Sequence, residues 1–338
     1  MPHEAHDDLL HGEEAIIALL APLAEGFPGA FGLEDDCALL TPAPDADLVL
    51  KTDPVAEGVH FLASDTPQDI AWKALAVNAS DIAAKGARPL GYLMALSFPD
   101  PPRLDWVRGF ADGLRAAQQQ FGCHLMGGDT DRRPGPLTIS ITMIGSVPRG
   151  QMVRRATACP GDVLFVSGSI GDAGLGLALA RAPKLAAELG LTDADAQYLC
   201  RRYRRPEPRL ALADALRQYA SAAMDISDGL VKDLQRLLRA SGVAGRLLAG
   251  DVPLSDPARQ IVARAPERLT QFITAGDDYE VLAAVSTVNA EAFAAAAHAA
   301  GVPVSRIGAI LPSPSALTII GHDGRPLPVP RRTGWDHF

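Results

Sequence analysis

Residues 222–242, AAMDISDGLVKDLQRLLRASG, read as a short apolar strand that runs directly into a helix. Asp225 and Asp228 stand at the junction, three residues apart, with the hydroxyl of Ser227 between them. Strands that alternate with helices are typical of an α/β or α+β protein rather than an all-β one. The stretch therefore indicates the fold class. Its two carboxylates begin the helix, form half of a metal site or, as we expect, do both.

The same alternation extends along the chain. We expect strands over residues 47–53, 91–98, 137–147, 162–168, 222–227 and 278–285. We expect helices over residues 67–89 and 106–120, from the Gly-rich turn near 170 to 187, and over 229–242, followed by a final helix and two strands. The polar segment 147–162 is punctuated by Pro and Gly, so we place a boundary near residue 150. A length of 338 residues fits two domains, 1–150 and 151–338.

Composition excludes several classes of protein. The formal net charge is −9, and residues 201–205 form the only Lys/Arg cluster, which argues against a nucleic-acid surface. Four scattered cysteines without a CxxC pair indicate neither a disulfide framework nor a zinc site, so a reducing cytoplasm fits best. Residues 1–14 lack the pattern of a signal peptide, and no apolar run is long enough to span a bilayer. We expect a cytoplasmic enzyme without nucleic-acid or membrane partners.

Acidic residues gather where predicted strands end. The five stretches are Glu34–Asp36, Lys51–Asp53, Asn78–Asp81, Gly127–Asp131 and Asp225–Asp228. Loops at strand ends are where α/β proteins hold ligands, because the scaffold fixes groups that solvent still reaches. Oxygen donors without accompanying Cys or His are the ligand set of a hard cation such as Mg²⁺. The pattern favours a magnesium site.

Each acidic stretch also has a structural interpretation. Asp228 with Ser227 suits a helix N-cap, although Asp225 lies on the apolar strand side. Asp81 is able to pair with Lys85 four residues on, and Gly127–Asp131 has the composition of a tight turn. Glu34–Asp36 has the composition of a solvated charge run. The chain contains no GxxxxGK[ST], HExxH, GxSxG or GxGxxG pattern, which disfavours a P-loop NTPase and the common hydrolases.

Taken in order, the motifs resemble those of the thiamine-monophosphate kinases from about residue 12 to the C-terminus. The matching stretches are EDDCALL, TDPVAEGVHF, DIAWKALAVNASDIAAKGARP, GGDT, an R-x-x-x-x-PGD segment, GSIGDAGLGL, RRPEPRL, AMDISDGL, AGDDYEV and GWDHF. This family belongs to the aminoimidazole ribonucleotide synthetase-like superfamily, whose members bind ATP without a P-loop. The resemblance implies an N-terminal α+β domain that forms a β-barrel with a second subunit, and a C-terminal α/β domain covering the cleft.

The resemblance also implies the reaction and the site. ATP phosphorylates thiamine monophosphate to thiamine diphosphate with several Mg²⁺ ions, and Asp129, Asp225 and Asp228 are central to the chemistry. The implied metal ligands are Asp36, Thr52, Asp53, Asp81, Asp129, Asp225 and Asp228. The implied nucleotide contacts are Gly128, Asp129, Arg155 and Ser227, and the implied substrate contacts are His60, Asp277 and Trp335. Trp335 offers an aromatic face to the cationic thiazolium, or simply packs against its domain.

Three positions depart from the family pattern. Glu34 stands where the family has glycine, which raises the question of the loop before Asp36. Asp277 stands where the family has glutamate, so its substrate contact is one methylene shorter. Lys51 replaces a small hydroxyl residue, so any metal contact there has to come from its backbone.

Other functions stay open at this stage. A selenophosphate synthetase requires a reactive Cys near its N-terminal Gly-rich segment, and none precedes Cys37. A hydrogenase-maturation protein of this fold ends in cysteine, whereas this chain ends in Phe338. An aminoimidazole ribonucleotide synthetase is a further alternative within the superfamily. A non-catalytic nucleotide-binding protein predicts the loss of some metal ligands, and a purely structural role for the acids predicts that Mg²⁺ leaves ATP affinity unchanged.

Overall fold

A computed structural model describes residues 9–10, 12–312 and 317–336. The chain divides into two compact units. Unit 1 comprises Met1–Ala79 and Pro89–Ser146, and unit 2 comprises Ser80–Arg88 and Val147–Phe338. The predictions for the first eight residues and for the last two residues of GWDHF fall outside the described part of the chain.

Unit 1 is built on a four-stranded sheet within the described residues, in the order β1-β4-β2-β3. Its strands are β1 (Ala46–Ala56), β2 (Arg88–Phe98), β3 (His124–Arg132) and β4 (Thr138–Pro148). Its helices are α1 (Glu13–Leu20), α2 (Pro67–Ala84) and α3 (Leu104–Phe121), with the short 3₁₀ helices η1 (Ala21–Ala24) and η2 (Pro28–Leu33). The last residues of α2 and the first of β2 belong to unit 2.

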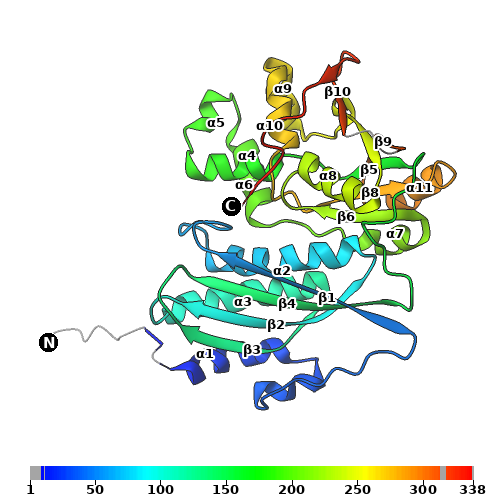
Figure 1. Ribbon diagram of the computed structural model, residues 1–338. Coiled ribbons are helices and arrows are strands. Elements are labelled where there is room, and N and C mark those ends of the chain that lie inside the picture. The colour runs from blue at the N-terminus through cyan, green and yellow to red at the C-terminus, as the bar shows by residue number, and fades with distance from the viewer. Residues whose placement is uncertain (1–8, 11, 313–316, 337–338) are drawn as a thin grey trace. The chain divides into compact units, whose positions relative to one another are not determined.

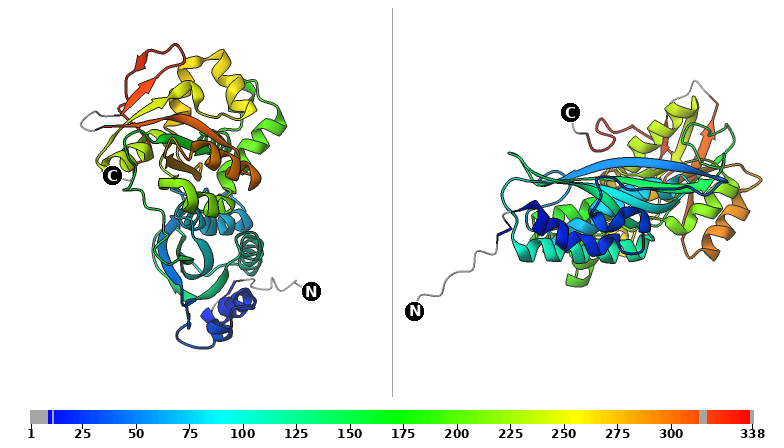
Figure 2. Two further views of the ribbon diagram at one scale, coloured as in Figure 1. Left: turned by 90° about the vertical axis from the view of Figure 1, so that its right-hand side faces the viewer. Right: turned by 90° about the horizontal axis from the view of Figure 1, so that it is seen from below.

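One face of this sheet is covered and the other is open. Figures 1 and 2 show α2 and α3 on the same face, and the rings of Trp72 and Phe121 join the two helices at 5.1 Å. Side chains alternate along a strand, so Tyr92 and Met94 point to the buried face while Leu93 between them is 41% exposed. Among the residues that the structure describes, the four strands of one chain do not close into a barrel.

Unit 2 contains a mixed sheet that has seven strands in the described residues, in the order β11-β10-β7-β9-β5-β8-β6. The strands are β5 (Val163–Ser167), β6 (Ala220–Ile226), β7 (Ala244–Leu248), β8 (Glu280–Val285), β9 (Val304–Leu311), β10 (Thr318–Ile320) and β11 (Pro326–Leu327). The α-helices are α4 (Asp172–Arg181), α5 (Leu185–Glu188), α6 (Asp193–Arg204), α7 (Ala213–Tyr219), α8 (Leu230–Ser241), α9 (Asp256–Arg264), α10 (Leu269–Ile273) and α11 (Ala290–Ala299).

Apolar side chains on both faces of this sheet explain its stability. In β8, Leu282 belongs to a core that includes the leucines of α8, and Val281 belongs to a second core with residues of α7 and α11. The rings of Phe165 and Phe293 meet in the second core at 5.2 Å. The central strands are therefore buried on both sides, which is why they read as continuous apolar runs.

Two local predictions are wrong. The helix expected to reach residue 187 ends at Arg181, and Pro183 begins the connection to the short α5, because proline cannot continue a helix. The tight turn considered for Gly127–Asp131 lies inside β3, where residues 127–131 pair in parallel with Leu93–Ser97 of β2. Pairing with a neighbouring strand overrides the turn-forming composition of the segment. No helix of the described residues is long and apolar enough to cross a membrane.

Candidate functional site

A cavity in unit 1 collects two acidic segments that are far apart in the chain. Its volume is about 640 Å³, and pockets of ~300–1,000 Å³ are typical of small-molecule sites. Residues 35–38, which follow η2, line it together with residues 125–130 of β3. The structure thus brings Asp36 and Asp129 to one cavity.

Close contact between β2 and β3 positions Asp129. Gly128 lies opposite Met94, and Asp129 lies opposite Ala95. A Cβ atom at position 128 would lie 1.8 Å from the carbonyl oxygen of Met94. Only glycine permits this approach, which leaves the Gly128 backbone without a side chain beside the cavity.

Strand β1 carries Thr52 and Asp53. Thr52 Oγ1 donates to the Ile141 carbonyl at 3.1 Å and accepts a hydrogen bond from Thr142 Oγ1 at 3.1 Å, and Thr142 lines the cavity. The Asp53 backbone N–H donates to Asn78 Oδ1 at 2.9 Å. Hydrogen bonding to β4 and to α2 therefore fixes this part of β1.

Lys51 pairs with the carboxylate that was expected to bind metal. Its Nζ lies 3.1 Å from Asp53 Oδ2, and both side chains are partly exposed. An ammonium at this distance competes with a cation for the same oxygen. The departure at position 51 therefore has a direct electrostatic consequence for Asp53.

Glu34 does not strain the loop before Asp36. Its φ angle is −94°, whereas the left-handed conformations of this region lie at Phe31, Gly32 and Leu33, with φ of 50°, 70° and 65°. Any residue adopts a negative φ without a penalty from its Cβ atom. Replacing the family's glycine by glutamate is thus compatible with the observed backbone.

His60 and Asp81 occupy different surroundings. His60 Nδ1 accepts the Ala56 N–H at 3.0 Å, so a neutral imidazole at this position carries its proton on Nε2. Asp81 is half-buried on α2, one turn after Asn78. Asn78 is not among the predicted metal ligands, but its side-chain amide binds the Asp53 backbone and so helps to position that residue.

In unit 2, backbone hydrogen bonds join the predicted metal loop to the predicted substrate loop. Asp225 ends up 5% exposed near the end of β6, opposite Val281 of β8. The N–H of Asp277 donates to the Ser227 carbonyl at 2.8 Å, and the N–H of Tyr279 donates to the Ile226 carbonyl at 2.8 Å. The two loops therefore form one rigid element.

The C-terminal segment binds the same element. The Trp335 N–H donates to the Asp228 carbonyl at 2.9 Å, and Lys232 Nζ donates to the Trp335 carbonyl. The Trp335 ring is partly exposed, and the Arg332 guanidinium lies 5.7 Å from its centroid. The structure thus brings Asp225, Ser227, Asp228, Asp277 and Trp335 together in unit 2.

The prediction that Asp225 and Asp228 begin the helix is wrong. The N-cap of α8 is Gly229, and it makes no side-chain capping bond. Instead Asp233, fully buried in the first turn, accepts the N–H groups of Ser227, Asp228 and Gly229 through Oδ2 at 3.0, 2.9 and 3.2 Å. A carboxylate there suits the positive end of the helix dipole.

The Asp228 carboxylate is consequently not occupied by capping. It lies 2.6 Å from Arg236 Nη2 and 3.3 Å from Lys232 Nζ. Arg236 also binds Asp233 at 2.8 Å, which links the capping acid to Asp228. Sequence reasoning missed Asp233 because an acid in the first turn of a helix is ordinary.

Arg155 is anchored away from this cluster. Its carbonyl accepts the Ser241 hydroxyl at 3.0 Å, at the C-terminal end of α8. The loop of Asp228 lies at the other end of α8, which spans 12 residues, and a helix of that length is ~18 Å long. The exposed Arg155 side chain is therefore the only part of this residue free to extend toward a ligand.

The oxygen donors at the cavity of unit 1 and those at residues 225–228 of unit 2 suit a hard cation. Asp36 and Asp129 line the cavity, and Thr52 hydrogen-bonds one of its lining residues. Asp225 lies near the end of β6 and Asp228 in the loop that follows, so carboxylate and hydroxyl oxygens predominate. Mg²⁺ typically binds one or two carboxylates together with phosphates and water. In the described ranges, no group of three or more His, Cys, Asp or Glu side chains stands ready to hold a metal.

Two family models match most of the chain. Residues 34–147 match the N-terminal domain of AIR synthase related proteins, and residues 159–319 match the C-terminal domain. The mixed α/β fold with two domains of this kind, expected from the sequence, is confirmed. The fold defines the class as AIR synthase related.

Relatives narrow the class to one kinase. The thiamine-monophosphate kinase of Caulobacter vibrioides is 42% identical over 325 residues, covering 95% of this chain and 89% of that protein. The Escherichia coli K12 enzyme of the same name is 38% identical over 309 residues, 91% of each chain. This chain belongs to the thiamine-monophosphate kinase family, a family of phosphotransferases, and the sequence-based recognition is confirmed.

Solved structures of thiamine-monophosphate kinases are similar to this chain over nearly its whole length. A crystal structure of thiamine-monophosphate kinase from Stenotrophomonas maltophilia has a TM-score of 0.78 at 36% identity, covering 96% of this chain and 93% of that chain. AaThiL complexed with AMPPCP and TMP has a TM-score of 0.75 at 30% identity, covering 97% of each chain. The hydrogenase maturation protein HypE of E. coli, at 21% identity and a TM-score of 0.74, shares the fold alone.

Proposed function

We propose that this chain transfers the terminal phosphoryl group of ATP directly to the phosphate of thiamine monophosphate, giving ADP and thiamine diphosphate. The observation that carries the proposal is the cavity of about 640 Å³ at which Asp36, Gly128 and Asp129 meet. Family membership and a relative solved with AMPPCP and TMP support the two substrates.

The reaction requires positioning more than proton transfer. An acceptor phosphate is already an anionic nucleophile at neutral pH, so no general base is needed. Donor and acceptor are both negative, and Mg²⁺ supplies charge neutralisation and stabilises the transferring oxygens when bound. We assign its ligands to the seven predicted residues, Asp36, Thr52, Asp53, Asp81, Asp129, Asp225 and Asp228.

The remaining residues have separate roles in the proposal. The Gly128 backbone, unobstructed by a side chain, binds nucleotide phosphate together with Ser227 and the Arg155 guanidinium, which matches phosphate geometry. His60 donates through Nε2 to the thiamine phosphate. Asp277 and the Trp335 ring bind the thiamine moiety, and there a thiazolium cation takes the place of Arg332 over the ring.

Phosphorus NMR of the purified protein with ATP, Mg²⁺ and thiamine monophosphate tests the proposed function. We expect thiamine diphosphate and ADP in equal amounts, no product from free thiamine, and no turnover when a chelator removes Mg²⁺. ATP hydrolysis without thiamine diphosphate would assign a different acceptor. Turnover that persists in excess chelator would contradict the proposed role of the acids.

We also propose that residues 1–150 form the nucleotide-binding and dimerisation domain, and that residues 151–338 form the C-terminal domain. The sheet face opposite α2 and α3, where Leu50 is 68% exposed, supports pairing with a second copy of the chain in a shared barrel. Burial of such apolar area stabilises association. A homodimer and a cytoplasmic location stay predictions.

Lys51→Ala tests the competition at Asp53. Removing the ammonium 3.1 Å from Asp53 Oδ2 removes one competitor for that oxygen. We expect the Mg²⁺ concentration for half-maximal activity to fall about two- to fivefold, because a partly exposed ion pair is worth ~0.2–1 kcal/mol. Activity titrated with MgCl₂ measures it, with the exposed Lys184→Ala as control. An unchanged or higher requirement would show that Lys51 does not compete.

A further inference from the structure

The turn that carries Asp277 has an unfavourable backbone conformation. Asp277 and Tyr279 have φ of 70° and 51°, in the left-handed region that non-glycine residues rarely adopt. Tyr279 is also buried, and its hydroxyl lies 3.3 Å from Asp277 Oδ1. Such conformations persist only where the surroundings over-determine them, and they concentrate at functional sites. The surroundings of residues 277–279 therefore require an explanation.

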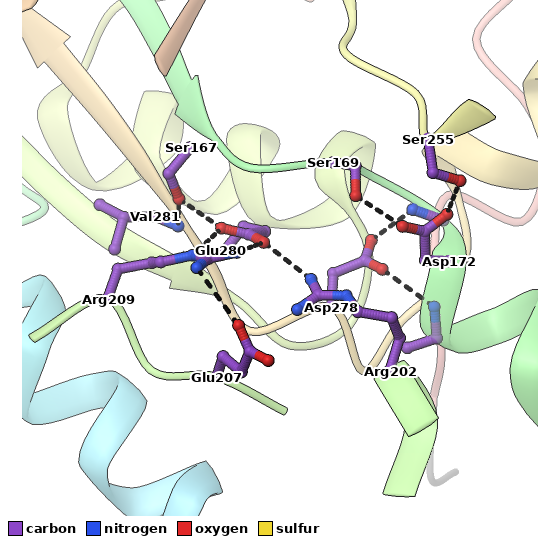
Figure 3. Close-up of polar contacts among 12 residues, drawn as sticks. Ser167, Ser169, Asp172, Arg202, Glu207, Arg209, Ser255, Asp278, Glu280 and Val281 are labelled. Atoms are coloured by element: carbon purple, nitrogen blue, oxygen red, sulfur yellow. Dashed lines mark hydrogen bonds and ion pairs between the residues drawn. The ribbon is translucent and has the colours of Figure 1, made fainter. Parts of the chain in front are cut away.

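One anchor of the turn is Glu280, which directly follows it and is fully buried. Its carboxylate accepts from Arg202 Nη2 at 2.7 Å, from Arg209 Nε at 2.7 Å and from Ser167 Oγ at 2.6 Å (Figure 3). Burial alone raises the pKa of Glu280, but the hydrogen bonds and charges of Arg209 and Arg202 outweigh burial and lower it overall. Glu280 is thus an ionised carboxylate that is hydrogen-bonded by three side chains.

A second anchor is Asp278, in the middle of the turn and 1% exposed. Its carboxyl oxygens accept the N–H of Gly171 at 2.7 Å and that of Ala173 at 3.4 Å, at the start of α4. Burial raises the pKa of Asp278, and the charge of Arg202 opposes that rise. Arg202 therefore acts on both acids that flank Tyr279, and Figure 3 shows its side chain beside them.

Arg202 comes from α6 and differs from its neighbour in burial. Its side chain is 8% exposed, whereas that of Arg201 is 72% exposed and lies 3.9 Å from Glu207. A buried guanidinium is stable only when carboxylates pair with it, so its place between these acids is well defined. Nothing in the proposed phosphoryl transfer uses Arg202 directly.

We propose that Arg202 is a positioning residue for thiamine monophosphate. It holds Glu280, attracts Asp278, and thereby keeps Asp277 and Tyr279 left-handed, so that the short Asp277 side chain points where the substrate binds. The inference rests on the proposed function, because it assigns the substrate contact to Asp277. It predicts an effect on the thiamine phosphate and not on ATP.

Steady-state kinetics of Arg202→Lys against Arg201→Lys tests this. Lysine keeps the charge but loses the guanidinium Nη2 that donates to Glu280. We expect the KM for thiamine monophosphate to rise about tenfold, as for one misaligned hydrogen bond, with the KM for ATP within about twofold. Arg201→Lys matches the wild type in both. Arg209→Lys, which removes two hydrogen bonds to Glu280 but leaves Arg202 beside both acids, should show the same selective rise.

Each other outcome has a definite meaning. Equal increases in both KM values, an unchanged KM for thiamine monophosphate in a folded Arg202→Lys protein, or loss of folding in both Arg202→Lys and Arg209→Lys would overturn the positioning role. Thermal unfolding curves establish which proteins are folded at the assay temperature. Lack of turnover in the wild type would contradict the proposed function instead, so the two failures are distinguishable.

Discussion

Asp225→Asn is expected to lower kcat at least about 100-fold, as loss of a charge that stabilises a phosphoryl-transfer transition state does. Asn keeps the shape of the side chain but removes the negative charge. The position is rigid, because Asp225 pairs with Val281 in β8 and its side chain is 5% exposed. Because the strand is fixed there, we expect no neighbouring carboxylate to move into the place of the Asp225 charge. Kinetics over a range of MgCl₂ concentrations measures the effect.

The control for Asp225→Asn is the same substitution at Asp256. Asp256 lies exposed in the first turn of α9 and pairs with Arg259 on the surface. Asp256→Asn should leave kcat within about twofold, since exposed ion pairs contribute little. Full activity of a folded Asp225→Asn protein at ordinary Mg²⁺ would remove this residue from the ligand set. Recovery at high Mg²⁺ would instead indicate weakened metal binding with intact chemistry.

The sequence predicts those features of the site that depend only on the succession of neighbouring strands and helices along the chain. Asp225 and Asp228 follow an apolar strand, so their place at a strand end is visible from the alternation of apolar and helical segments. The Glu34–Asp36 stretch does not follow this rule, because it comes after η2 and the next strand, β1, begins only at Ala46. What the sequence leaves open is which distant segment lies beside each loop, since strand order depends on packing across the whole unit.

Two residues illustrate the limit. Arg202 belongs to the basic run 201–205, which suggests a solvated face, yet it is buried against Glu280, 78 positions later. Asp233 is an ordinary helix acid in sequence, yet it binds the backbone N–H groups of the three residues 227–229 before α8. A long-range ion pair, or an acid inside a helix that binds the backbone before that helix, has no local sequence signal. Each of these charged residues, seen alone in the sequence, is equally compatible with exposure to solvent.

The backbone conformation at position 277 explains why aspartate stands there instead of the family's glutamate. At a φ of 70°, aspartate is better tolerated than glutamate, because its short side chain forms local hydrogen bonds. The observed bond partner is the Tyr279 hydroxyl. The shorter acid therefore suits this turn, and its reach toward substrate depends on how firmly Asp278 and Glu280 hold the turn in place.

Gly128→Ala is expected to lower both stability and activity, and Gly127→Ala is its matched control. The added methyl at 128 would lie 1.8 Å from the Met94 carbonyl oxygen and 2.8 Å from its carbon, whereas at 127 the nearest atom is Leu93 Cδ2 at 3.4 Å.

The Met94 contacts are backbone, so β3 has to shift away from β2 and carries Asp129 with it. Overpacking of this kind costs about 1–3 kcal/mol in the free energy of unfolding, and a displacement of ~1 Å lowers kcat/KM about 100-fold. Urea unfolding and kinetics measure the two effects separately. If Gly128→Ala loses stability but keeps its activity, Asp129 does not need its observed position and the metal role assigned to it is wrong. If Gly127→Ala loses as much as Gly128→Ala, the defect comes from any side chain on this strand rather than from the close approach of β2 and β3.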